Sequence, residues 1–285
     1  MSVFSYFSKA WTVTKYTGLF FLALLIPLST AAVGKTGRVG GIYDITVAGI
    51  TVGRGSVSLI LQDNAYSAKI GMEPAGIGTL FSTGAGGAEA TGWIQNNTIL
   101  PSRYTMTSKA AGRDFYANLQ MGSGHIREAV ISPRFKPSKT RVKMTEAHKK
   151  NAMDPISAAL LTLPEGAHSI SDTACNRRLH IYDGWTRFDV ELAYKETKQV
   201  QGNGYDGKVV VCQAQWIPVA GHKPERESVK LLVNAQKIEA WFAPVGNSGI
   251  LIPYRIAMPT ITGDLVIKAQ ELILSYGSEG TSALH

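Results

Sequence analysis

The sequence predicts a mainly β protein, an antiparallel sheet curled around a short buried helix. Two observations predict this. Runs in which apolar and polar side chains alternate recur along the chain, as expected for strands with one buried face. Short turn signals and 29 glycines without a fixed period separate these runs, and no long helical pattern links them. Parallel strands need such crossover connections, so the sheet is expected to be antiparallel.

Residues 1–32 are expected to form a signal peptide outside this fold. Lys9 and Lys15 precede an apolar run at 19–28, and small residues follow it. This is the layout of a secretory signal, with cleavage expected after Ala31 or Ala32. The alternative is a retained membrane anchor, which is disfavoured because the run is short for a bilayer span of roughly twenty residues.

The first half of the mature chain, residues 41–132, is expected to be a meander of short strands. Gly49 and Gly53 bracket a turn-like break after the first strand, and the pairs 63–64 and 96–97 are typical turn residues. The expected strands are residues 42–48, 57–61, 66–72, 92–94, 100–106, 114–121 and 126–131.

The segment between Pro74 and Gly92 is apolar and dense in glycine. It has no lysine followed by serine or threonine and no complete dinucleotide pattern, which disfavours a phosphate-binding loop. We interpret it as a short helix or a ligand lid around Ile77, Leu80 and Phe81, with glycines that permit tight turns on either side. It could gate a cavity, or equally be plain core.

Residues 133–150 interrupt the strand pattern with a strongly basic linker. The formal net charge is +8, Lys9 and Lys15 account for two of these charges, and the linker supplies the rest. We hypothesise contact with an anionic surface such as lipid head groups, and a solvated basic loop is the plainer alternative. Nucleic acid is disfavoured because the chain is expected to be exported and this segment lacks a series of aromatic residues interleaved with its cations. The basic residues are Arg134, Lys136, Lys139, Arg141, Lys143, Lys149 and Lys150.

A short apolar helix is expected to follow, completing the connection 133–167 between the two halves. Asp154 is placed to cap its N-terminus and Pro155 fits its first position. The sequence 164–166 ends the helix within about three turns. A short and almost wholly apolar helix has to be buried, so the sheet is expected to curl around it. Its apolar side carries Ile156, Ala159, Leu160 and Leu163.

The second half, residues 168–275, repeats the strand pattern and contains the only two cysteines, Cys175 and Cys212. In an oxidising compartment two lone cysteines favour a structural disulfide, worth about 4 kcal/mol for a loop of this length. A metal site is disfavoured, because the cysteines lack the short paired spacing of zinc motifs. The expected strands are 178–182, 186–194, 208–216, 237–243, 250–258 and 262–274, with a helical turn within 226–236 and a flexible tail at 276–285.

The sequence resembles the DUF3108 family of exported bacterial proteins along nearly the whole mature chain. The resemblance rests on Tyr43-Asp44 with Gly53, the glycine-rich segment 76–92, residues 100–104, 153–158, 175–184, 204–205, 218–222 with Cys212, and Ile252-Pro253. It implies a sheet wrapped into an open or spiral barrel, a LolA/LolB-like or β-spiral architecture similar to the periplasmic lipoprotein carriers. It implies no catalytic residues.

No pattern of catalytic residues is present, so the chain is not expected to be an enzyme or to need a cofactor or metal. His222 is the best single polar candidate, although a lone histidine is more often a loop hydrogen-bonding residue. Two hypotheses follow. The first is a periplasmic carrier that binds a lipid or a lipoprotein segment in an apolar lumen. The second is a structural or interaction protein of the cell envelope without a small ligand.

Overall fold

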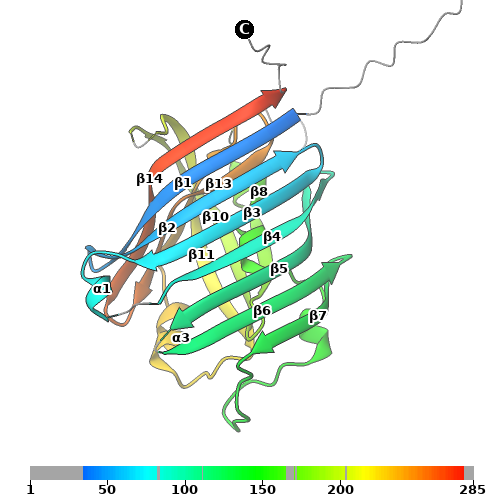
Figure 1. The fold of residues 1–285 in the computed structure, drawn as a ribbon, viewed down its shortest axis with the longest axis vertical. Helices are drawn as coiled ribbons and strands as arrows, with labels where there is room; N and C mark the ends of the chain where they lie inside the picture. Colours follow the sequence, from blue (N-terminus) through cyan, green and yellow to red (C-terminus); the bar gives the residue numbers. More distant parts are fainter. Residues whose placement is uncertain are drawn as a thin grey trace, which may run out of the picture. The chain divides into compact units, whose positions relative to one another are not determined.

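Fourteen strands form one antiparallel sheet in the computed structural model, which describes residues 35–81, 84–110, 112–164, 170, 172–202 and 204–278. Strands that follow one another in sequence are neighbours in each half, and β1 pairs with β14 to join the halves (Figure 1). The order is β7-β6-β5-β4-β3-β2-β1-β14-β13-β12-β11-β10-β9, and β8 pairs with β13 beside this path. The expected fold class is confirmed.

The first half consists of β1 (Lys35–Val47), β2 (Ile50–Gln62), β3 (Ala65–Pro74), α1 (Gly78–Phe81), β4 (Gly86–Gln95), β5 (Thr98–Ala110), β6 (Arg113–Gly122) and β7 (His125–Ser132). The connection holds η1 (Glu146–Lys149), α2 (Pro155–Ala158), β8 (Leu161–Thr162) and η2 (Asp172–Ala174). The second half consists of β9 (Arg177–Tyr182), β10 (Arg187–Val200), β11 (Gly207–Ala220), α3 (Glu227–Val233), β12 (Ile238–Pro244), β13 (Ile250–Thr260) and β14 (Gly263–Ser278).

The strands are longer than the sequence patterns predict. The expected break at 49–53 is wrong, because the first turn is only Ala48-Gly49, whose φ angles of 51° and 80° suit a two-residue hairpin. β4 starts at Gly86 rather than at the predicted Gly92, because a glycine-rich backbone can still form the hydrogen bonds that pair it with β3. At Gly92 a Cβ would lie 2.3 Å from the Leu100 carbonyl oxygen and 2.7 Å from the Tyr66 ring. Gly92 therefore permits close packing inside the sheet.

The predicted helix is correct in position but wrong in length. Asp154 caps it as expected, and its carboxylate accepts hydrogen bonds from the backbone N–H groups of Ile156 and Ser157, both at 2.9 Å. Only one turn forms, however, because Leu161 and Thr162 pair with Leu251 and Ile250 of β13 as strand β8. No helix within the described part of the chain is long and apolar enough to cross a membrane.

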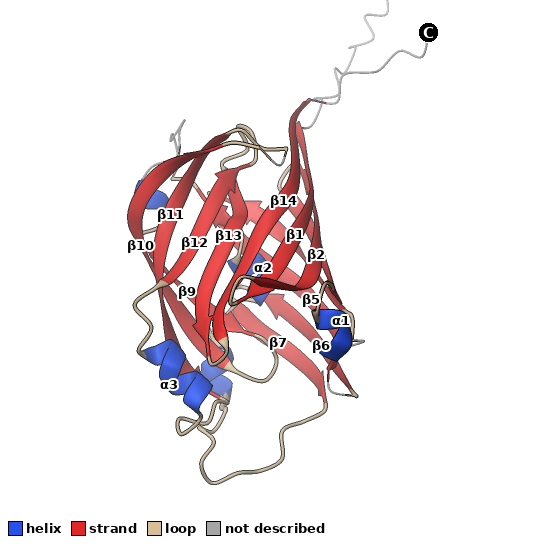
Figure 2. Cartoon of the chain, turned by 90° about the vertical axis from the view of Figure 1, so that its left-hand side faces the viewer, coloured by secondary structure: helices blue, strands red, loops and turns tan. Residues whose placement is uncertain are grey.

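The two edge strands, β7 and β9, are linked by residues 150–153 rather than by pairing with each other. On the β7 side Ala152 donates its N–H to the Gly124 carbonyl at 3.1 Å. On the β9 side Met153 donates to the carbonyl of His180 at 2.8 Å and accepts from Tyr182 at 2.9 Å. These residues form a seam along the gap in the curled sheet, and α2 follows directly behind it (Figure 2).

Two apolar clusters make up the core. The first covers the inner face of β1–β7, extends onto β13 and β14, and includes Ile156 of α2 and Leu160 just after it. The second is formed by β10–β13 together with Leu161, Leu163 and both cysteines. All the described residues belong to one compact unit. The connection thus fills the middle of the curled sheet, as the buried-helix prediction requires.

Candidate functional site

Alternating strand directions bring several connections to one end of the sheet, which we call the α3 end. β1, β3, β5 and β7 end there, as do β9, β11 and β13. This end therefore holds the turns 48–49 and 261–262, the short helices α1 and α3, and the start of the basic linker after Ser132 (Figures 1 and 2).

An apolar cavity of about 380 Å³ lies between α2 and the second half of the sheet. Pro155, Ala158 and Ala159 form one wall, and side chains of β9–β13 form the other. Leu232 of α3 also lines the cavity. Among the described residues that line it, the one with a charge is Glu239, whose carboxylate forms ion pairs with Lys195 and Arg255.

The walls of this cavity are only partly shielded from solvent. Phe188 and Trp216, with ring centroids 5.9 Å apart, are half-buried, as are Leu232 and Met258. Across the lumen, Ile70 pairs with Val57 and Ala88, which belong to the inner face of the first half. Ile70 is nevertheless 42% exposed, and Met72, two residues further along that face, is 55% exposed. The lumen is therefore not filled near the α3 end.

A buried polar cluster fixes α2 within the sheet. The Ser157 hydroxyl donates to the Asp154 carboxylate at 2.5 Å and is hydrogen-bonded to the Tyr66 hydroxyl of β3 at 2.6 Å. Burial raises the pKa of Asp154 to about 6, although the hydrogen bonds from Ser157 and Ile156 oppose this. Burial also raises the pKa of Tyr66 and of Tyr104, and the nearby Asp154 charge adds to both effects.

Tyr66→Phe is expected to lower the free energy of unfolding by about 1–2 kcal/mol. The substitution removes the hydroxyl group that is hydrogen-bonded to the buried Ser157 hydroxyl, and Ser157 is then left with Asp154 as its partner. Urea denaturation measures the change. Tyr194→Phe is the matched control, because the Tyr194 hydroxyl bonds Thr197 at an exposed site and its loss should cost little. Equal effects of the two variants would contradict a role for Tyr66 in holding α2.

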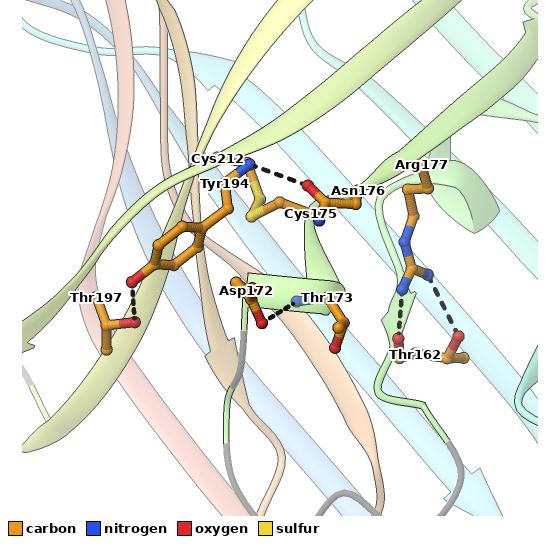
Figure 3. The surroundings of a disulfide bond; sticks show 9 residues. All are labelled: Thr162, Asp172, Thr173, Cys175, Asn176, Arg177, Tyr194, Thr197 and Cys212. Atoms are coloured by element: carbon orange, nitrogen blue, oxygen red, sulfur yellow. Dashed lines mark hydrogen bonds between the residues drawn. A yellow bond between two sulfur atoms is a disulfide. The ribbon is translucent and has the colours of Figure 1, made fainter.

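The disulfide is present, which confirms the pairing of Cys175 and Cys212 (Figure 3). Cys175 lies just before β9 and Cys212 on β11, so the bond crosses the intervening strand β10. Both cysteines are fully buried in the second apolar cluster. Next to the bond, Arg177 donates to the Thr162 carbonyl at 2.7 Å. The disulfide and Arg177 together tie β8 and the start of β9 to the wall of the cavity.

The structure divides the seven predicted basic residues into two groups. Arg141 is half-buried, stacks over the Phe135 ring and donates to the Gly221 carbonyl, and Lys149 pairs with Glu146. The other five are exposed, and among the described residues none of them lies within ion-pair distance of a carboxylate. They are Arg134, Lys136, Lys139, Lys143 and Lys150.

The predicted ligand lid lies at the α3 end, in α1 and the residue before it. Ile77 is 43% exposed and does not line the cavity. The side chains of Leu80 and Phe81 lie outside the described residues, as do the expected signal peptide and residues 279–285 of the tail. Gating by this segment stays a prediction. β14 extends to Ser278, three residues into the expected tail.

His222 does not form part of the cavity. Its carbonyl accepts a hydrogen bond from Val142 at 3.0 Å, and burial lowers the pKa of its side chain. A second buried acid, Asp189, is surrounded by the side chains of Arg178, His180 and Arg187. Hydrogen bonds hold its pKa below the usual value despite its burial. This network supports the pairing of β9 with β10.

Sequence reasoning missed most of the cavity wall. Trp216 and Phe188 fall at inward positions of predicted strands, and this alternation was the available signal. Leu232 belongs to a segment for which only a helical turn was expected. The curvature of the sheet decides which apolar side chains fill the core and which line a cavity.

Comparisons with known proteins identify a family and a similar solved structure. No curated protein matches the sequence. Among solved structures, the beta-barrel-like protein of domain of unknown function DUF1849 from Brucella abortus is similar, with a TM-score of 0.45 and 9% sequence identity; the match covers 85% of this chain and 98% of that one. The family described as "Protein of unknown function (DUF3108)" matches residues 42–270. The chain therefore belongs to the DUF3108 family.

Proposed function

We propose that this chain is a periplasmic cell-envelope protein that binds a hydrophobic ligand, a lipid or a lipoprotein segment, between α2 and β9–β13. The observation that carries the proposal is the apolar cavity of about 380 Å³, which falls within the range of about 300–1,000 Å³ typical of ligand sites. The unfilled lumen at the α3 end would give a ligand access to it.

The chemistry of the walls favours an acyl chain over a polar molecule. Alanine, aliphatic and aromatic side chains surround the cavity, and the one acid among them is already paired. Burying an apolar chain there gains about 25 cal/mol per Å² of surface removed from water. A polar ligand would lose its hydrogen bonds to water without replacement. The buried disulfide supports an oxidising compartment, consistent with export through the expected signal peptide.

Ala214→Phe is expected to weaken binding of a fluorescent acyl probe at least tenfold, because the added ring occupies the cavity. Ala193→Phe is the matched control. Ala193 lies on the neighbouring strand β10 and is exposed on the opposite face, so the same added ring should leave probe binding unchanged. Titration with the probe measures both affinities, and tryptophan fluorescence, to which Trp216 in the wall contributes, follows occupancy. Equal binding by the two variants would contradict this site.

Mass spectrometry of the natively purified protein tests the ligand class directly. A copurified lipid or acylated peptide is expected, and Ala214→Phe should reduce its amount. Absence of any copurified lipid together with absence of probe binding would overturn the proposal. The protein would then be better described as an envelope interaction protein without a small ligand.

A further inference from the structure

We propose that the α3 end is a docking surface for a bilayer containing anionic lipids, so that the opening of the lumen faces the membrane. Aliphatic side chains on one side of this end would enter the lipid interface, and cations on the other would bind lipid phosphates. The inference concerns the outer surface and does not depend on a ligand in the cavity.

The aliphatic side chains stand on three connections that lie next to one another. Ile261 is 64% exposed, Ile50 51% and Ile77 43%. Ala48 donates its N–H to the Asp264 carbonyl at 3.0 Å, which joins the β1–β2 and β13–β14 turns. Ala75 donates to the Val52 carbonyl at 3.2 Å, which brings the connection that carries Ile77 beside β2. Three exposed isoleucines, each in or directly beside one of these neighbouring connections, form an apolar ridge.

The cations lie on the basic linker where it runs from β7 towards α3. Thr140 donates to the Glu225 carboxylate at 2.7 Å, and Val142 exchanges backbone hydrogen bonds with His222 and Gly221 at 3.0 and 2.9 Å. The linker is thus fixed beside the connection that leads into α3 (Figure 2). Its exposed cations here, unpaired among the described residues, are Arg134, Lys136, Lys139 and Lys143.

Anionic lipid is the partner that suits both features together. Lysine and arginine near an anionic bilayer contribute about 1 kcal/mol each, and aliphatic side chains gain by leaving water for the acyl boundary. The apolar tips and the cations flank the same end of the sheet, where Ile70 and Met72 are exposed on the inner face. Docking in this orientation would let an acyl chain pass between bilayer and lumen.

Cosedimentation of the purified protein with phosphatidylglycerol–phosphatidylethanolamine vesicles tests the inference, with phosphatidylcholine vesicles as the comparison. Ile261→Gln should weaken binding several-fold, whereas Ile273→Gln should not. Ile273 is the matched control, because it is 60% exposed towards the other end of the sheet. Lys136→Gln, Lys139→Gln and Lys143→Gln should each weaken binding about fivefold at low salt, as 1 kcal/mol per charge implies. Lys208→Gln, at the other end of the sheet, should change nothing.

Equal binding to phosphatidylcholine vesicles, or equal losses for Ile261→Gln and Ile273→Gln, would overturn the docking surface. These positions are exposed, so thermal denaturation should show unchanged folding of the variants. Ala214→Phe should still bind vesicles fully, which separates a failure of the docking surface from a failure of the cavity proposal.

Discussion

Replacing both cysteines, as Cys175→Ala with Cys212→Ala, is expected to lower the free energy of unfolding by about 4 kcal/mol. The bond closes a loop across 37 positions, and releasing it restores the conformational freedom of that loop in the unfolded chain. Both side chains are fully buried, so alanine also leaves small voids in the second apolar cluster. Denaturant unfolding measures the loss.

Reduction of the wild type supplies the control for this experiment. Dithiothreitol should bring the wild type close to the double variant and leave the variant itself unaffected. If the stability of the wild type does not change on reduction while thiol titration shows that the bond has opened, the disulfide does not stabilise the fold. Acyl-probe binding by the variant at low temperature then shows whether the cavity wall needs the bond.

Asp154→Asn is expected to remove a dependence of stability on pH between about 4 and 6. Burial raises the Asp154 pKa to about 6 in the folded protein, against 3.8 in an unfolded chain. The folded state therefore binds the proton more tightly. The resulting stabilisation is fully present below pH 4 and is lost as pH rises through 6, a change of about 3 kcal/mol. Urea denaturation across this range measures the slope.

Two further variants separate the charge of Asp154 from its capping role. Asp114→Asn, at an exposed carboxylate, should keep the wild-type slope. Asp154→Ala should also lose the slope, and its stability should lie about 2–4 kcal/mol below that of Asp154→Asn at every pH, because it leaves the Ile156 and Ser157 N–H groups without their acceptor in the core. An Asn variant that retains the slope would show that another group titrates.

The sequence was sufficient for the strand content, the antiparallel order, the capped helix and the disulfide, because each depends on local chemistry. Alternating side chains identify strands one at a time, and Asp154-Pro155 marks a helix start wherever it occurs. Strand ends were less well predicted. Strands β2 and β4 begin at Ile50 and Gly86, within segments whose glycines suggest loops.

The site was less predictable, since it depends on curvature. Leu232 and Trp216 meet only because the sheet turns β11 and α3 towards α2, and no spacing in the sequence encodes that approach. The length of α2 was overestimated for a related reason. Leu161 has the same apolar character in a helix or a strand, and its pairing with Leu251 decided between them.

The seam at residues 150–153 means that the circumference of the lumen is not fixed by strand pairing. A closed barrel can widen only by breaking a ladder of hydrogen bonds along two whole strands. Here the edges are joined through backbone contacts of Ala152 and Met153 and through the Trp185 side chain, which donates to the Pro133 carbonyl at 2.8 Å. Opening that line would leave every strand pair intact, while α2, which follows directly in the chain, would move with it. The space beside α2 is thus bordered by a seam whose opening breaks no strand pair.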